Sequence, residues 1–251
     1  LGVTEDKVYI VSTQDTDVTP FDTGAYASRQ TYVSGKAVKK TAEMMKDKIL
    51  EYASWKLKMD QQTLDIRNNM IVTAEGEELL TMEALATEAL YSLERSVHIT
   101  AEATSHCKEN TFASGACFAE VEVDMPLGKV NVLKIINVHD SGILMNPKLA
   151  EAQVHGGMSM GLGYGLSEEL MYDAKGKPLN NNLLDYKLPT AMDTPELNVE
   201  FIELQDPTGP FGNKALGEPP AAVLQATGIG FNQLPMEPQR LVAAFKEAGL
   251  V

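Results

Sequence analysis

The chain is poor in cysteine and in positive charge, and both shortages exclude classes of protein. Only 2 of its 251 residues are Cys, at positions 107 and 117, so a disulfide-stapled scaffold and a zinc or iron–sulfur site held by cysteines are poorly supported. Its 21 Lys and Arg stand against 35 Asp and Glu, for a net charge of −14. This acidic balance disfavours binding to nucleic acid or to an anionic membrane surface.

Hydrophobic runs of membrane-spanning length and metal-binding histidine pairs are missing as well. The uncharged stretch 154–167 contains His155 and several Gly, and falls short of the roughly 20 apolar residues that a spanning helix needs. The His residues are scattered without an i, i+4 pair, so we expect no metal held by protein side chains. No targeting signal is visible, and the chain begins with Leu1 rather than Met, which suggests a processed product or a piece of a longer chain.

The remaining composition is typical of a globular protein, with 44% hydrophobic residues. Strand patterns mixed with single helices, without strict alternation, predict an α+β fold of mixed sheets and packed helices. We expect two lobes, an N-terminal lobe over 1–105 and a C-terminal lobe over 106–251. The patterns predict strands near 7–12, 64–66, 70–72, 97–103, 117–124, 129–136, 170–172 and 197–204, and helices near 35–59, 81–93, 146–170 and 239–248.

Small residues precede the first predicted helix. The stretch 22–29 contains Gly24 and Ser28, and its backbone N–H groups could converge on an anion beside the positive end of a helix that begins near Gly35. An ordinary loop with a helix cap explains the same residues, and composition alone favours that simpler interpretation.

The predicted helix from Asn146 carries an unusual number of glycines. Gln153, Gly157 and Gly161 fall one turn apart, and further glycines lie beside them, although each interior Gly costs about 0.5–1 kcal/mol relative to Ala. Something must therefore approach this face closely. A tightly packed helix and a flat ligand that hydrogen-bonds to Gln153 are equally compatible with the sequence.

A carboxylate lies in the stretch 207–220, which is rich in Gly and Pro. Glu218 precedes Pro219 and Pro220, which push its backbone into an extended conformation and stiffen the next residues of the chain. A fixed carboxylate suits a general base. A solvated Glu in a turn is the simpler interpretation for an arbitrary protein.

Together, in this order and spacing, these stretches resemble the molybdenum hydroxylase family of xanthine dehydrogenases and aldehyde oxidoreductases. The similarity is to the second, C-terminal molybdopterin-binding domain of the large subunit, and it covers nearly the whole chain. The motifs that carry it are DTDVTP at 15–20, GAYASR at 24–29, AEVEVD at 119–124, VHDSG at 138–142, NP at 146–147, QVHGG at 153–157, DYKLPT at 185–190, GPFG at 209–212 and GEPP at 217–220.

The resemblance implies a molybdenum–molybdopterin cofactor, in a mononucleotide or dinucleotide form, whose own dithiolene holds the metal. Gln153 is implied to hydrogen-bond the pterin, with the glycine face as clearance for a flat tricycle, and Glu218 matches the catalytic base of the family. The other implied cofactor contacts are the backbone amides of Tyr26, Ala27, Ser28 and Arg29, with Gln30 and Thr31 near the phosphate.

The implied activity is oxidative hydroxylation of a purine-like N-heterocycle or of an aldehyde, with oxygen from water. Glu218 would take the proton from a molybdenum-bound hydroxyl, a hydride would pass to the sulfido ligand, and two electrons would leave through 2Fe–2S centres to FAD on partner domains or subunits. Such chemistry, with few cysteines, leads us to expect a cytoplasmic location.

The chain departs from the family pattern in two respects. Only residues 221–226 separate the GEPP motif from the closing segment, where the family has a longer helix. The N-terminal half of the molybdopterin subunit is also absent, so we expect the chain to be inert until it joins that partner. The alternative is a non-catalytic cofactor-binding or assembly module of the same fold.

Overall fold

The computed structural model describes residues 1–251 except 12–14, 18–20, 22–23, 27, 107, 110 and 217–233. The chain forms two compact units. The first contains residues 1–26 and 30–108, and the second contains residues 27–29 and 109–251. Helices and two small sheets confirm the predicted α+β class.

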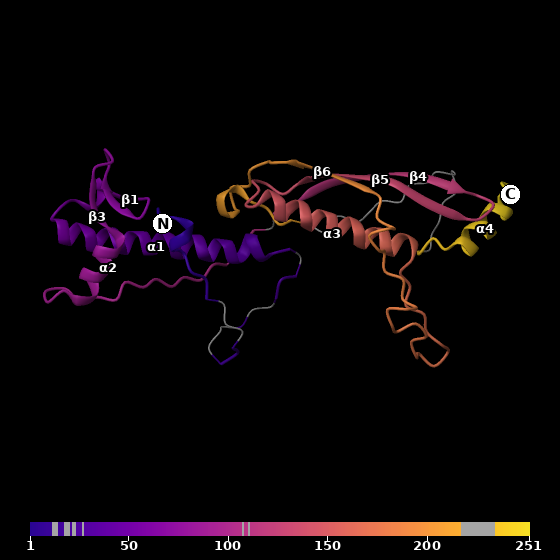
Figure 1. Ribbon diagram of the computed structural model, residues 1–251, viewed down its shortest axis with the longest axis horizontal. Coiled ribbons are helices and arrows are strands. Elements are labelled where there is room, and N and C mark those ends of the chain that lie inside the picture. The colour runs from indigo at the N-terminus through magenta and orange to yellow at the C-terminus, as the bar shows by residue number, and fades with distance from the viewer. Residues whose placement is uncertain are drawn as a thin grey trace. The chain divides into compact units, whose positions relative to one another are not determined.

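The first unit packs a three-stranded antiparallel sheet and a short helix against one long helix, α1 (Figure 1). Its core contains Tyr52 of α1, Ile71 of β2 and Leu85 of α2, each no more than 2% exposed. The Thr81 hydroxyl caps α2 by accepting a hydrogen bond from the Ala84 amide at 3.0 Å. The elements are η1 (Glu5–Lys7), α1 (Gln30–Leu57), η2 (Gln61–Thr63), β1 (Leu64–Arg67), β2 (Met70–Thr73), β3 (Glu78–Thr81) and α2 (Met82–Tyr91).

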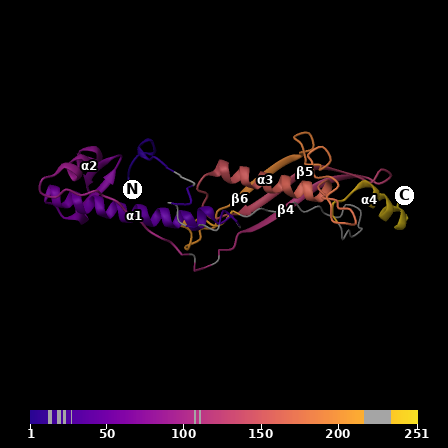
Figure 2. The same cartoon turned by 90° about the horizontal axis from the view of Figure 1, so that it is seen from below.

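The second unit is built on a three-stranded sheet with the order β4-β5-β6, in which β4 and β5 are antiparallel and β5 and β6 are parallel. Helix α3 lies along this sheet in both views (Figures 1 and 2), and buries Val154 and Met158 against Ile135 of β5. The elements are β4 (Ser114–Asp124), β5 (Lys129–Asp140), α3 (Pro147–Leu166), β6 (Glu196–Ile202), η3 (Pro210–Gly212) and α4 (Pro238–Glu247).

Most elements with a clear local signal are confirmed. Both predicted hairpins form, as β1 with β2 and as β4 with β5. The Asn146 side chain caps α3 by accepting a hydrogen bond from the Leu149 amide at 3.1 Å, with Pro147 in the first turn, as the Asn-Pro pair predicts.

Three predicted strands do not form regular strands in the part of the chain that the structure describes. Residues 8–11 have no regular structure, and their apolar side chains are 52–88% exposed, while Ser12 lies outside the described residues. The stretch 97–103 runs without a strand partner, and the carbonyl of Thr100 accepts a hydrogen bond from Lys48 of α1 instead. The expected strand 170–172 is reduced to an isolated bridge between Tyr172 and Pro178.

Candidate functional site

The loop predicted to contact the cofactor leads directly into α1. This helix begins at Gln30 rather than near Gly35, so Gln30 and Thr31 form its first turn and Ser28 and Arg29 immediately precede it. Ser28 has a φ of 53°, in the left-handed region that a non-glycine residue rarely adopts. The positive end of α1 therefore belongs to the same short stretch of chain as the predicted contacts.

The other predicted contacts in this loop divide between the two units. Tyr26 is 59% exposed, and Ala27 lies outside the described residues. Tyr26 and Gln30 belong to the first unit, whereas Ser28 and Arg29 are assigned to the second, which also contains Gln153.

Gln153 lies on α3 beside a bare patch of helix. Its side chain is exposed, and Gly156, one turn further along, is exposed too. Apart from the backbone of its own helix, a Cβ added at Gly156 would meet no atom of the described residues within 4 Å. Residues at i and i+3 share a helix face, so an amide side chain borders an open stretch of backbone here.

The rest of the glycine stripe has a different explanation. A Cβ at Gly163 would overlap the carboxylate of Glu168, which also accepts a hydrogen bond from the Tyr186 hydroxyl at 2.8 Å. Gly157 and Gly165 are buried. The glycines predicted to form one exposed face of this helix therefore differ: Gly157, Gly163 and Gly165 are packed within the second unit, whereas Gly156 is exposed.

Glu218 lies outside the described residues, but the segment that leads to it is described up to Leu216. Residues 212–214 run alongside residues 141–143. The amide of Ile143 donates to the carbonyl of Gly212 at 3.0 Å, and the amide of Lys214 donates to the carbonyl of Ser141 at 2.8 Å. These two backbone hydrogen bonds therefore hold the start of this segment against the loop between β5 and α3.

A buried ion pair that no sequence motif indicated joins the same two segments. Asp140 Oδ2 lies 2.5 Å from Lys214 Nζ, and the side chains are 8% and 13% exposed. Burial alone disfavours the charged carboxylate, but hydrogen bonds from Lys214 and from the amides of Gly142 and Leu204 hold the pKa of Asp140 below its usual range. The pair spans 74 residues of sequence, so no local pattern could have indicated it.

Several buried polar side chains lie close to Asp140 along the chain. Asn137 is fully buried, and neither its amide nitrogen nor its oxygen has a hydrogen-bond partner within the described part of the chain. The same holds for both ring nitrogens of His139 and for the Ser141 hydroxyl. Burial lowers the pKa of His139, although the neighbouring Asp140 opposes this, so the neutral ring is favoured.

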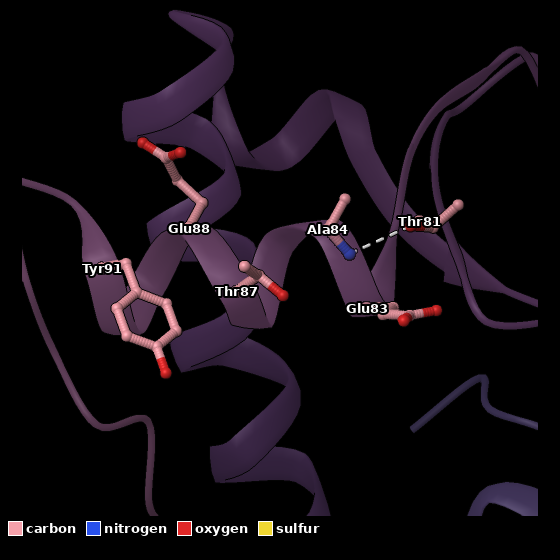
Figure 3. A pocket seen from close by; sticks show the side chains of 6 residues that line it. All are labelled: Thr81, Glu83, Ala84, Thr87, Glu88 and Tyr91. Carbon is pink, nitrogen blue, oxygen red and sulfur yellow. Dashed lines mark hydrogen bonds between the residues drawn. The ribbon is translucent and has the colours of Figure 1, made fainter.

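A surface pocket of about 440 Å³ lies on α2 (Figure 3). The residues that line it are about 50 or more positions along the chain from the predicted site residues of the first unit. Its lining comes from one side of a single helix and its cap, with Glu83, Glu88 and Tyr91 along it. No residue of the predicted cofactor site contributes to it. The pocket therefore supplies no evidence on that site.

Neither a protein-held metal site nor a membrane span is found in the part of the chain that the structure describes. Among those residues, no group of three or more His, Cys, Asp or Glu side chains is arranged to hold a metal ion. No helix of the described ranges combines the length and the apolar character needed to cross a membrane.

Two solved structures have the same fold as this chain. The chain superposes on Cu,Mo-CO dehydrogenase with a TM-score of 0.81 and 28% identity, covering 94% of this chain and 31% of that one. Quinoline 2-oxidoreductase from Pseudomonas putida 86 gives a TM-score of 0.81 at 25% identity, with 92% of this chain and 32% of that one covered.

The sequence comparisons identify the family. The putative xanthine dehydrogenase molybdenum-binding subunit XdhA of Escherichia coli strain K12 is 44% identical over 263 positions, covering 100% of this chain and 35% of that protein. The chain thus spans about a third of the length of this relative. The sequence profile of the molybdopterin cofactor-binding domain family matches residues 1–195, which include the loop before α1 and Gln153. The chain therefore belongs to the molybdopterin cofactor-binding domain family, and its relatives are molybdenum hydroxylases of the xanthine dehydrogenase and CO dehydrogenase type.

Proposed function

We propose that this chain forms part of the catalytic site of a molybdenum hydroxylase that hydroxylates an N-heterocycle, with Gln153 as a pterin contact and Glu218 as general base. The observation that carries the proposal is the exposed amide of Gln153 beside the open backbone at Gly156. A flat tricyclic ligand needs a hydrogen-bonding side chain next to a surface without side chains. This part of α3 offers an exposed amide beside one exposed position without a side chain, so the residues present are compatible with the edge of a pterin.

The loop before α1 would hold the anionic part of the cofactor. Tyr26, Ala27, Ser28 and Arg29 would offer backbone amides, and Gln30 and Thr31 would lie near the phosphate. Support comes from the position of the helix start, because the positive dipole end of a helix favours an anion nearby. The bound cofactor would supply the two-electron redox chemistry.

Glu218 would accept the proton released as oxygen from water is added to the substrate. The two prolines after it restrict the backbone, which suits a base that must be held in one geometry. The carboxylate must be ionised before the reaction begins. A positioned base of this kind contributes about 10²–10⁴-fold to the rate.

The substrate class we favour is a purine-like N-heterocycle rather than an aldehyde. The relative with 44% identity is named for xanthine, and quinoline 2-oxidoreductase is named for another N-heterocycle. The rest of the site would come from the N-terminal half of the molybdopterin subunit, since the chain covers 35% of that relative. Iron–sulfur and FAD domains or subunits would carry the electrons away.

The test is Glu218→Gln in the assembled enzyme, compared with Glu200→Gln, which alters an exposed Glu on β6. We expect Glu218→Gln to keep its molybdenum and pterin content while hydroxylation of xanthine or hypoxanthine falls at least about 100-fold. The control should retain wild-type turnover. Unchanged turnover in Glu218→Gln would refute the base assignment.

The alternative, a non-catalytic cofactor-binding or assembly module, rests on one sequence observation. The alignment with XdhA runs over 263 positions whereas the chain has 251 residues, so that relative carries residues with no counterpart here. An assembled protein that binds molybdopterin but turns over no N-heterocycle would support this alternative.

A further inference from the structure

The buried ion pair between Asp140 and Lys214 sits where three parts of the second unit meet. Asp140 ends β5, and its Oδ1 accepts hydrogen bonds from the Gly142 amide at 3.0 Å and from the Leu204 amide, just after β6, at 3.4 Å. Its other oxygen binds Lys214 Nζ at 2.5 Å. One carboxylate therefore ties the end of β5, the end of β6 and the segment 212–214 together.

Backbone contacts reinforce this junction. Besides the bonds from Ile143 to Gly212 and from Lys214 to Ser141, the amide of Asp206 donates to the carbonyl of Gly212 at 3.1 Å. A side chain added at Gly142 would overlap the Gly212 carbonyl, so the two segments approach as closely as backbone allows. Because both side chains are largely buried, the ion pair is sensitive to the loss of either partner.

The position of the pair along the chain suggests what this junction is for. Lys214 precedes Glu218 by four residues, and Asp140 precedes Asn146, the cap of the helix that carries Gln153, by six. We infer that Asp140 and Lys214 are positioning residues that fix residues 212–214, which lead to the proposed base, beside the loop that leads into α3, an inference that rests on the proposed function. Neither residue needs to touch the substrate. A misplacement of about 1 Å in a catalytic group can lower the rate about 10²-fold, so the effect should appear in kcat.

The test uses the double variant Asp140→Asn/Lys214→Met in the assembled enzyme. Removing both charges avoids the lone buried charge that either single variant would leave, so that folding is not the limiting factor. The control is Lys134→Met/Glu196→Gln, which removes a more exposed pair of the same unit, with side chains 33% and 61% exposed and atoms 3.1 Å apart. For each variant we would measure molybdenum and pterin content, KM, kcat, and hydrogen exchange at the amides of Ile143 and Asp206, both of which donate to the Gly212 carbonyl.

We expect the double variant to keep its cofactor and its KM, to lose at least tenfold in kcat, and to exchange both reporter amides at least tenfold faster. The control should match the wild type in all four measurements. A kcat within twofold of wild type, unchanged exchange, or loss of the cofactor would overturn the inference, the last because it would show a merely structural pair.

Glu218→Gln, measured in parallel, separates the two proposals. If kcat falls in Glu218→Gln but not in the double variant, the positioning role is refuted and the proposed function is retained. If Glu218→Gln keeps the kcat of the wild type, both the assignment of Glu218 as general base and the positioning role are refuted.

Discussion

The substitution Gly156→Ala should stabilise helix α3 and, if the proposed function is right, should also lower the cofactor content of the protein. In Gly156→Ala the new methyl group meets no atom of the described residues within 4 Å beyond its own helix backbone, so no clash with them opposes the gain in helix propensity. That gain is about 0.5–1 kcal/mol, which should slow opening of α3 about two- to fivefold in the cofactor-free protein. If the bare surface beside Gln153 receives the pterin, the same methyl group should lower cofactor content several-fold.

The assay combines hydrogen exchange of the α3 amides with molybdenum and pterin analysis of the full assembled protein. Glu151→Ala is the matched control, because it changes an exposed residue of α3 on a different side from Gln153 and leaves the glycine surface intact. Slower exchange with undiminished cofactor content would refute the idea that this surface binds the pterin. Faster exchange would refute the finding that the position has open space.

Two further predictions concern the first unit. Hydrogen bonds from Lys46, the Ile66 amide and Arg67, partly opposed by burial, lower the pKa of Asp65 from 3.8 to about 2. The charged form is favoured in the folded state, so its stabilisation is present above about pH 4 and is lost as pH falls towards 2. The side chain is 32% exposed, and after discounting for solvent we expect Asp65→Asn to remove about 1–2 kcal/mol from the unfolding free energy at about pH 6, with the deficit vanishing in acid denaturation near about pH 2. Thr81→Ala should remove the cap of α2 (Figure 3) and destabilise this helix by about 1 kcal/mol, seen as faster amide exchange in α2. Thr87→Ala on the same helix is the control, and an equal effect from both would contradict the capping role.

Much of the fold could be predicted because its signals are local. Alternating apolar residues predict β4 and β5, and the Asn146-Pro147 pair predicts the start of α3. The short strand β3 was missed, since Glu78–Thr81 has only four residues and directly precedes a helix. Residues 8–11 show the reverse error, because β propensity alone does not create a strand without a partner.

The candidate site divides in the same way. The sequence alone determined the family motifs, the capped glycine-rich helix and the chemical identities of Gln153 and Glu218, since each depends on residues close together in the chain. Only the tertiary structure decided that Gly156 faces open space while Gly163 packs against Glu168, and that Asp140 pairs with Lys214. The physical reason is that helix periodicity and capping act within a few residues, whereas packing and burial depend on which distant segments the fold brings together.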